Sequence, residues 1–159
     1  MERRAGAFDM RLAQPGDEAE VAALIAAFRD SFDEREPPDE EIDRVVAELI
    51  GDQQTEFLLA GRPAVGMAQL RFRLSVWTGR EDAWLEDVFV VPQARGRGIG
   101  RALLEASVER ARRRGCARIQ LDTNEDNSVA LALYASVGFR TAKRAAGDGG
   151  RDLYLTRWL

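Results

Sequence analysis

The first half of the chain combines strand-like and helix-like patterns of apolar residues. Phe8, Met10 and Leu12 alternate with polar or small residues, which is typical of a half-buried strand. Apolar residues at positions 21, 24, 25 and 28 recur at the spacing of one helix face, and those at 42, 45, 46 and 49 repeat that spacing. We expect Asp17 at the N-cap of the first helix and Gly51 at the end of the second.

Three strands joined by short turns are predicted between residues 55 and 91. The first covers Thr55 to Ala60, the second runs from Ala64 to about Val76, and the third ends at Val91. Turn-forming residues at 61–63 and 78–80 separate them, so the sequence predicts an antiparallel meander. A glycine inside the second strand, Gly66, suggests a bulge or a close approach of another backbone.

The last third of the chain completes the predicted fold. A buried helix face at positions 99, 102, 103 and 106 precedes a stop at Gly115. Further elements are expected at 117–122 (strand), 128–137 (helix), from 139 (strand) and at 153–159 (strand), with a hairpin turn at 147–150. The order β-α-α-β-β-β-α-β-α-β-β predicts an α/β fold with a mixed, mostly antiparallel central sheet flanked by helices. Its length predicts a single domain, residues 1–159.

The absence of histidine narrows the chemistry that the chain can perform. The 159 residues include no His and one Cys, so the commonest general base and the commonest zinc ligand are missing. We therefore expect no metal site, and proton transfer must use carboxylates, Tyr, Lys, Cys or water. The single Cys116 excludes an internal disulfide, and we expect it to be a small buried filler rather than a nucleophile.

Charge is distributed unevenly along the chain. The net charge is −4, which argues against nucleic acid as a partner. Arginines crowd residues 95–114, and those at 112–114 are expected to complement the dipole at the end of a helix. Acids crowd residues 30–48 and form either a solvated, well-capped surface or an acidic mouth for an amine.

The sequence gives no sign of a membrane or secretory segment. No apolar run approaches the roughly 20 residues that span a bilayer, so we expect no membrane partner. Residues 1–7 contain no long apolar run after their arginines, so we expect no signal peptide. A cytoplasmic location is the default expectation for such a chain with one cysteine.

A strand, a loop rich in Gly and Arg, and a helix follow one another between Trp84 and Leu104. This layout suits a phosphate ligand, because the first turn of a helix has unpaired N–H groups and glycines let an anion approach. A tight strand-to-helix turn with solvated arginines is the alternative. Two familiar phosphate motifs are excluded by spacing, since both G-x-G-x-x-G and the P-loop pattern require glycine where Arg101 stands.

Two motifs carry a resemblance to a known family. The pattern Arg95-x-x-Gly98-x-Gly100 resembles the acyl-CoA-binding motif R/Q-x-x-G-x-G/A of the GNAT superfamily of N-acetyltransferases. Residues 127–139, which read N-S-V-A-L-A-L-Y-A-S-V-G-F, resemble the later signature N-x-x-A-x-x-L-Y-x-x-x-G-F of the same superfamily. The two motifs occur in the family's order, about one helix and one strand apart, and together cover roughly residues 84–139.

The resemblance implies acetyl-CoA as co-substrate. Its pyrophosphate would be bound by the loop residues Arg95, Gly96, Arg97, Gly98, Ile99, Gly100 and Arg101. Its pantetheine arm would pair with the strand residues Val88, Phe89 and Val90, which would align the thioester.

The second motif supplies a candidate acid. By the resemblance, Tyr134 donates a proton to the leaving CoA thiolate, and Asn127 hydrogen-bonds the pantetheine arm. The alternative for Tyr134 is a core aromatic residue. The alternative for Asn127 is a helix N-cap, which is compatible with the first role.

Glu86 is the candidate base. An alkylamine with a pKa near ~10.4 must lose a proton before it attacks a thioester. Residues 84–90, W-L-E-D-V-F-V, are similar to the L-E-D-x-x-V segment of polyamine N-acetyltransferases, whose Glu meets the substrate amine directly or through water. Strand alternation predicts Glu86 on the face of Val88 and Val90, with Asp87 opposite. A sheet-edge carboxylate paired with an arginine is an equally good interpretation.

These observations predict an N-acetyltransferase that moves an acetyl group from acetyl-CoA to a primary amine by direct attack. The expected acceptor is a small molecule, polyamine-like or otherwise cationic. One alternative is transfer to a protein or peptide N-terminus or a lysine, and another is a non-catalytic acyl-CoA-binding regulatory module. A homodimer is an expectation from the family resemblance alone.

Overall fold

The computed structural model describes residues 8–144 and 152–159. Its elements follow the predicted order, with one short 3-10 helix added before the third α-helix. The strands are β1 (Met10–Leu12), β2 (Thr55–Gly61), β3 (Ala64–Leu74), β4 (Glu81–Val90), β5 (Arg118–Asn124), β6 (Arg140–Arg144) and β7 (Asp152–Trp158). The helices are α1 (Glu18–Asp30), α2 (Asp39–Ile50), the 3-10 helix η1 (Pro92–Ala94), α3 (Ile99–Arg113) and α4 (Ser128–Ser136).

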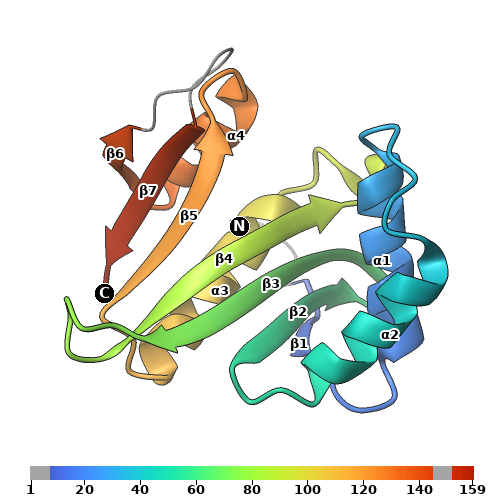
Figure 1. The fold of residues 1–159 in the computed structure, drawn as a ribbon. Helices are drawn as coiled ribbons and strands as arrows, with labels where there is room; N and C mark the ends of the chain where they lie inside the picture. Colours follow the sequence, from blue (N-terminus) through green and yellow to red (C-terminus); the bar gives the residue numbers. More distant parts are fainter. Residues whose placement is uncertain (1–7, 145–151) are drawn as a thin grey trace, which may run out of the picture.

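The strands form one mixed sheet in the order β1-β2-β3-β4-β5-β7-β6 (Figure 1). Neighbours from β1 to β4 pair antiparallel, which confirms the predicted meander. β4 and β5 pair in parallel, because α3 connects them as a crossover. β7 pairs antiparallel with both β5 and β6. The predicted mixed, mostly antiparallel sheet is therefore confirmed.

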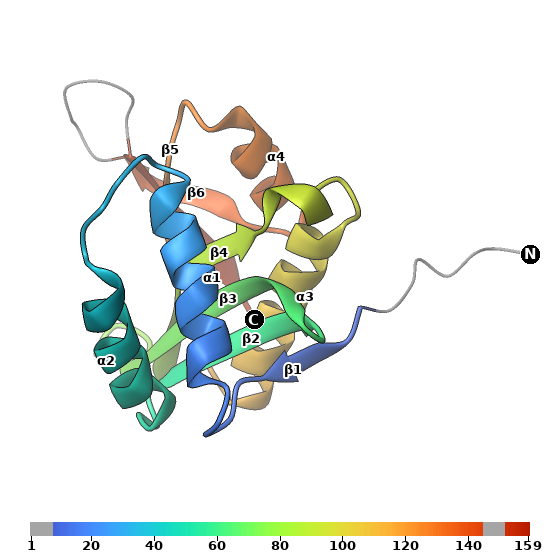
Figure 2. The same ribbon diagram turned by 90° about the vertical axis from the view of Figure 1, so that its right-hand side faces the viewer.

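Helices cover both faces of the sheet, and each face has its own apolar core. α1 and α2 cover one face, while α3 and α4 lie on the other (Figure 2). The core under α1 and α2 contains Val21, Ala22, Leu24, Ile42, Val46, Phe57, Leu59, Met67 and Phe89. The larger core under α3 includes Leu103, Leu104 and Val108, against which Leu131, Leu133 and Tyr134 of α4 pack. The helix faces predicted from apolar spacing therefore point inward.

β4 and β5 pair over a short stretch and then separate. Ala83 pairs with Ile119 and Trp84 with Gln120, whereas β4 continues to Val90 and β5 to Asn124. Beyond these two pairs the parallel strands diverge (Figure 1). We call the diverging part, residues 85–90 and 121–124, the fork.

A buried ion pair fastens the base of the fork. Asp82 of β4 is 2% exposed and accepts a hydrogen bond from Arg118 Nε of β5 at 2.8 Å. The Thr78 hydroxyl donates to the other carboxylate oxygen at 2.9 Å. Side chains thus join β4 to β5 in addition to the two backbone pairs.

A β-bulge interrupts β4 at Glu86. Residues 70 and 69 of β3 pair with Leu85 and Asp87, so Glu86 is an extra residue without a partner in the ladder. Leu85 and Val88 consequently both face the α3 core, although strict alternation would put them on opposite faces. Asp87 lies opposite Val88, as predicted. The predicted unbroken alternation through Glu86 is wrong, because the extra residue shifts the pattern.

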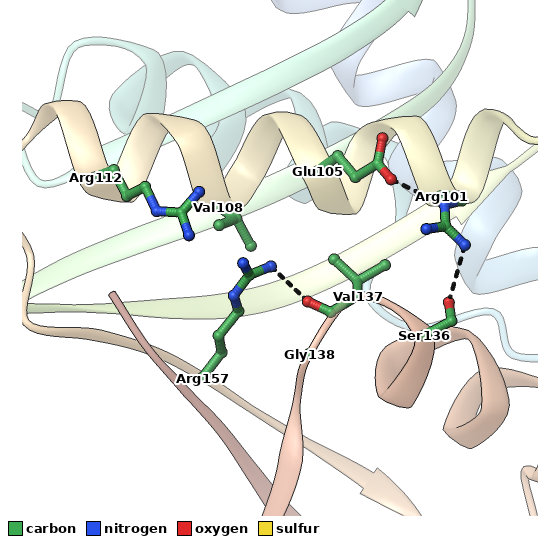
Figure 3. Close-up of a pocket in the computed structure, with 8 residues that line it drawn as sticks. All are labelled: Arg101, Glu105, Val108, Arg112, Ser136, Val137, Gly138 and Arg157. Carbon is green, nitrogen blue, oxygen red and sulfur yellow. Dashed lines mark hydrogen bonds and ion pairs between the residues drawn. The ribbon is translucent and has the colours of Figure 1, made fainter. Parts of the chain in front are cut away.

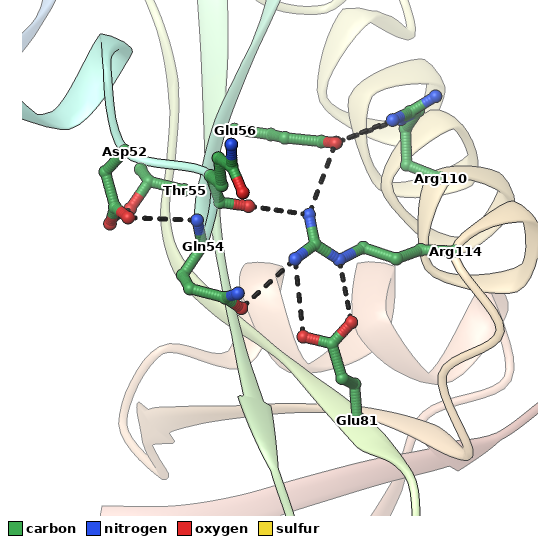
Figure 4. A network of polar contacts seen from close by, with 8 residues as sticks. Asp52, Gln54, Thr55, Glu56, Glu81, Arg110 and Arg114 are labelled. Atoms are coloured by element: carbon green, nitrogen blue, oxygen red, sulfur yellow. Dashed lines mark hydrogen bonds and ion pairs between the residues drawn. The ribbon is translucent and has the colours of Figure 1, made fainter.

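Ion pairs fix the C-terminal end of α3 to the sheet (Figure 4). Arg110 donates two hydrogen bonds to Glu56 of β2, at 2.6 and 2.9 Å. Arg114 donates to both carboxylate oxygens of Glu81 at the start of β4, at 3.1 and 3.3 Å. Its guanidinium carbon also lies 3.9 Å from the centroid of the Phe72 ring. These contacts fix the direction in which the N-terminus of α3 points.

Several local predictions can be compared with the structure. Gly66 does lie at a close approach, since an added Cβ would stand 3.1 Å from the Phe89 carbonyl oxygen. The strand predicted to about Val76 ends at Leu74. Asp17 occupies the N-cap position of α1, but its carboxylate accepts from the Gln14 N–H and not from the helix.

The predicted turn at 147–150 and the stretch 1–7 lie outside the described residues. In the part of the chain that the structure describes, no helix has the length and apolarity needed to cross a bilayer.

Candidate active site

The loop between β4 and α3 leaves backbone N–H groups available. Gly96 and Gly98 have φ values of +78° and +82°, which residues with a Cβ rarely adopt, and nothing lies within 4 Å of either missing Cβ. Gly98 is the N-cap of α3, whose Ala102 N–H donates to the Gly98 carbonyl at 3.0 Å. The N–H groups of residues 99–101 precede this first helical bond and lie at the positive end of the helix dipole.

Arg95 is turned back toward β4. Its Nε donates to the Val90 carbonyl at 2.9 Å, and its guanidinium carbon lies 5.9 Å from the centroid of the Phe89 ring. Arg95 therefore holds the loop against the end of β4, a role that the sequence did not reveal. Its predicted contact with a pyrophosphate stays a prediction.

The other loop residues have distinct surroundings. Arg97 is exposed, and Ile99 is buried in the α3 core. A Cβ on Gly100 would stand 3.5 Å from Leu133 of α4, so this glycine lets α3 and α4 pack closely. Arg101 bridges the same two helices, with Nε donating to Glu105 at 2.8 Å and Nη1 to the Ser136 hydroxyl at 3.4 Å.

The free edge of β4 in the fork carries backbone hydrogen-bonding groups. The Val91 N–H donates to Val65 of β3 at 2.9 Å. Because the backbone groups of successive strand residues point to opposite sides, those of Val88 and Val90 turn away from β3 and toward β5. β5 has already diverged at this level, so it does not pair with them. Phe89, between them, is buried against α1, where its ring stacks on Phe28 at 5.1 Å.

Two carboxylates lie at the same level on the two prongs of the fork. Trp84 of β4 pairs with Gln120 of β5. Counting from that pair, Asp122 is two residues further along β5, and Asp87 is two residues further along β4 once the extra bulge residue Glu86 is left out. Both therefore occupy the sheet face of α1 and α2. Burial raises the pKa of the Asp87 carboxyl, and the charges of Glu86 and Asp122 raise it further. Sequence reasoning missed Asp87 and Asp122 as candidates, because only the bulge brings them level.

Tyr134 lies close enough to Asp87 and Asp122 for their charges to affect its pKa. Burial raises the pKa of its hydroxyl, and the charges of Asp122 and Asp87 add to that effect. The hydroxyl therefore stays protonated at neutral pH, as a proton donor requires. Its ring also packs against the α3 core and meets Phe139 edge-on at 6.0 Å, so the alternative of a core aromatic describes part of its surroundings.

Asn127 and Glu86 complete the predicted set. The Asn127 side-chain oxygen accepts from the Ala130 N–H at 3.3 Å, which confirms the N-cap and leaves the side-chain amide nitrogen free for another role. Glu86 is exposed. Its carboxylate forms no ion pair with the side chains of residues 8–141 or 153–159, so no arginine in those two ranges pairs with it.

The acidic segment between α1 and α2 is largely neutralised by local pairs. Arg29 binds Asp30 and Asp39 at 2.7 and 2.8 Å. Arg44 binds Glu41 and Glu48 in the same way on α2. A hollow of about 620 Å³ lies here and is lined by side chains of both signs of charge. These contacts favour the solvated, capped surface over an acidic mouth.

Cys116 is a buried residue without a chemical partner for catalysis. It is 4% exposed, and burial raises the pKa of its thiol to about 11, so the thiolate is scarce at neutral pH. This confirms the predicted filler. No group of three or more Cys, Asp or Glu side chains in the described ranges could hold a metal ion.

Comparison with known proteins gives a consistent family. Residues 21–139 match the model of the acetyltransferase (GNAT) family. The chain is 35% identical over 106 residues to thialysine N-epsilon-acetyltransferase of Mus musculus, covering 65% of this chain and 58% of that protein. The chain thus spans little more than half the length of that curated relative. It is 32% identical to aminoglycoside N(6')-acetyltransferase type 1 of Stenotrophomonas maltophilia, over 88% of this chain and 91% of that protein.

A solved structure agrees with the sequence comparison. A protein of Arthrobacter sp. FB24 named as an acetyltransferase superposes with a TM-score of 0.80 at 31% identity, covering 92% of this chain and 94% of that one. The matching family model spans the Gly-rich loop, the fork and α4, which are the elements assembled above. The chain belongs to the acetyltransferase (GNAT) family.

Proposed function

We propose that this chain is an acetyl-CoA-dependent N-acetyltransferase that transfers the acetyl group to a primary amine of a small cationic molecule. The observation that carries the proposal is the fork. A loop suited to an anion begins where β4 ends. The protonated Tyr134 and the carboxylates of Asp87 and Asp122 lie near the base of the fork. Family membership supports the same reaction class.

The chain's own residues fit CoA. Gly96 and Gly98 leave open space beside free amide groups at the N-terminus of α3, which suits a pyrophosphate. The backbone groups of Val88 and the N–H of Val90 suit the amides of an extended pantetheine arm, which would pair with β4 as a strand does, while the Val90 carbonyl accepts from Arg95. Asn127 offers its side-chain amide N–H groups on the opposite side of the fork.

Direct transfer needs one proton acceptor and one proton donor. The amine nitrogen forms a bond to the thioester carbonyl carbon, the C–S bond breaks, and the sulfur leaves as thiolate. Tyr134 supplies the proton to that sulfur, since its raised pKa keeps it protonated beforehand. The proton lost by the amine goes to Glu86 or Asp87, directly or through water. The raised pKa of Asp87 makes it the stronger base when ionised, so we favour Asp87.

A small cationic acceptor follows from the charges around the fork. Glu86, Asp87 and Asp122 attract an ammonium group, and no cationic side chain of residues 8–141 or 153–159 is paired with them. The two curated relatives above are named for small amine acceptors, a lysine analogue and an aminoglycoside. We therefore place polyamines, basic amino acids and aminoglycosides first among the acceptors to test.

The test is a screen for acetyl-dependent CoA release. The panel contains polyamines, aminoglycosides, amino acids and short peptides, with Tyr134→Phe as the catalytic control and product mass to identify the acetylated nitrogen. We expect release with a small cationic amine that Tyr134→Phe largely removes. Release with peptides alone would instead assign a protein or peptide acceptor. Tight CoA binding without release from any amine would favour a non-catalytic binding module.

A further inference from the structure

The sheet face that carries α1 and α2 extends beyond these helices. They pack on β2 and β3, and β5 and β7 lie past their edge (Figure 1). Strand register arranges the side chains of this face in rows that cross the strands. The row at the level of the fork, here called the acid row, contains Phe57, Gln69, Asp87, Asp122 and Tyr154. The next row, here called the tryptophan row, contains Arg71, Trp84, Gln120 and Thr156.

Gln69 is a buried polar side chain without a partner. It is 7% exposed, and its side-chain amide forms no hydrogen bond with the residues that the structure describes. Its neighbour on β2, Phe57, belongs to the apolar core under α1 and α2, whereas its neighbour on β4 is Asp87. Because buried amides are nearly always hydrogen-bonded, Gln69 calls for a partner that a molecule bound beside Asp87 would supply.

Two aromatic rings adjoin the acid row on the open face. Arg157 of β7 turns to the opposite face, where it lines a groove beside α3 and donates to the Val137 carbonyl (Figure 3). Strand alternation therefore places Tyr154 on the same face as Asp122, its pairing partner. Tyr154 is 39% exposed, and its ring centroid lies 6.5 Å from that of Trp84. A carboxylate beside aromatic rings suits an ammonium group on a methylene chain.

The charge of the open face changes sign beyond the acid row. The guanidinium carbon of Arg73 lies 5.6 Å from the centroid of the Trp84 ring, and Arg73 forms no ion pair with the side chains of residues 8–141 or 153–159. The carboxylate opposite it on β4, Asp82, is already engaged by Arg118 and Thr78. Rows on one face of a strand lie about 6.8 Å apart, so only a short distance separates the two signs of charge.

This arrangement selects among cationic amines. A diamine lying along the face would bring its second ammonium group close to Arg73, whereas a carboxylate there would be attracted. We propose that Gln69, Asp122, Trp84 and Arg73 form the acceptor subsite for a linear primary amine that carries a carboxylate at its far end, as a basic amino acid does. The amine meets Gln69 and Asp122 beside Asp87, the methylene chain lies on Trp84, and the carboxylate pairs with Arg73. The inference rests on the proposed function and narrows its acceptor class.

The first experiment compares L-lysine with 1,5-diaminopentane, which is lysine without its carboxylate. The wild-type kcat/KM is expected to be roughly 10-fold higher for L-lysine, the size of a charge-assisted hydrogen bond. Arg73→Gln lowers kcat/KM for L-lysine alone and abolishes the preference. Arg62→Gln is the matched control, an exposed arginine at the β2–β3 turn that pairs with Asp9, and it keeps the preference. Equal values for the two amines, or a preference for the diamine, overturn the subsite.

The second experiment tests the amine end with Gln69→Leu. The Gln69 amide has no partner in the free protein, so the free energy of unfolding stays the same or rises. The KM for L-lysine rises roughly 5-fold, and that for acetyl-CoA is unchanged. A purely structural amide gives the reverse, a loss of stability with the same KM for L-lysine, and that result overturns the placement of the amine.

A third measurement separates this subsite from the acetyltransferase proposal. Calorimetry measures the binding of L-lysine and 1,5-diaminopentane to protein saturated with CoA, so that no turnover is needed. Tighter binding of L-lysine that Arg73→Gln abolishes supports the subsite, even if no amine gives CoA release and the proposed function fails. CoA release with other amines but no preferential binding of L-lysine overturns the subsite and leaves the proposed function intact.

Discussion

The two ends of the fork are built from different kinds of groups. Where the prongs are far apart, the loop presents backbone amides, with Gly96 and Gly98 fixing their direction. Near the base the groups are side chains, and the charges of Asp122 and Asp87 help to raise the pKa of Tyr134.

This difference separates binding from turnover. Backbone amides at a helix N-terminus change little with pH and bind substrate and transition state alike. In the proposed mechanism the side chains at the base transfer the protons that move during the reaction, so we expect their effects in kcat and in its pH dependence. Substitutions in the loop should therefore change the affinity for acetyl-CoA and leave kcat nearly unchanged. Substitutions at the base should change kcat and leave that affinity nearly unchanged.

Tyr134→Phe should give the largest effect. Loss of the proton donor lowers kcat by about 10²–10⁴-fold, the usual range for a general acid or base. The affinity for acetyl-CoA, measured by calorimetry, should stay close to that of the wild type. A kcat within a few-fold of wild type would remove Tyr134 from the mechanism. It would also contradict the separation of binding and turnover between the two ends of the fork.

Substitution of the carboxylates should distinguish the candidate bases. We expect Asp87→Asn to lower kcat/KM by about 10²-fold, and Glu86→Gln to lower it less. Because the charge of Glu86 raises the pKa of Asp87, Glu86→Gln should also move the acid limb of the pH–rate profile to lower pH. The reverse ranking of the two variants would return the role of base to Glu86.

The raised pKa of Asp87 also predicts a pH-dependent stability. Between the ordinary Asp pKa and the raised folded value, the folded state binds more protons than the unfolded state. Stability therefore falls as the pH rises through that window and is constant above it. Asp87→Asn should remove this slope and be more stable than wild type at pH 7, as measured by denaturant unfolding. A slope that persists in the variant would assign it to another group.

Gly98→Asp should weaken acetyl-CoA binding at the other end of the fork. A side chain strains the backbone at φ +82°, and a carboxylate repels phosphate at the helix N-terminus. We expect the affinity in calorimetry to fall by at least about 10-fold. Gly79→Asp, at φ +69° in the distant β3–β4 turn, is the control for strain alone and should bind normally. Equal losses in both variants would mean that destabilisation, not the loop, explains the effect.

Arg114→Gln should have the smallest effect on catalysis. It removes a partly buried pair with Glu81 and a contact with Phe72, so unfolding should become easier by about 1–3 kcal/mol. Both kinetic parameters at 25 °C should remain near wild type, because Arg110 still anchors α3 to Glu56. A raised KM for acetyl-CoA would show that the far end of α3 controls the loop.

The sequence was most informative where backbone conformation limits the choice of residue. Gly96, Gly98 and Gly138 stand at positive φ, and the apolar spacing of the helices matched the two cores. The bulge at Glu86 left no such trace, because its residues are ordinary for a strand. Asp87 lies level with Asp122 only because of that extra residue. The hydrogen bond from Arg95 to the Val90 carbonyl depends on the conformation of the loop. Neither can be read from residue types along the chain.

The free edge of β4 has a consequence for the lifetime of the protein. The backbone groups of Val88 and the N–H of Val90 have no partner in β5, and an extended pantetheine arm would supply one. A ligand that binds only the folded chain stabilises it in proportion to the logarithm of its concentration, by about 2.7 kcal/mol at 100 times Kd. Resistance to proteolysis would then follow the metabolic supply of acetyl-CoA, and starvation would shorten the life of the enzyme as well as slow its reaction.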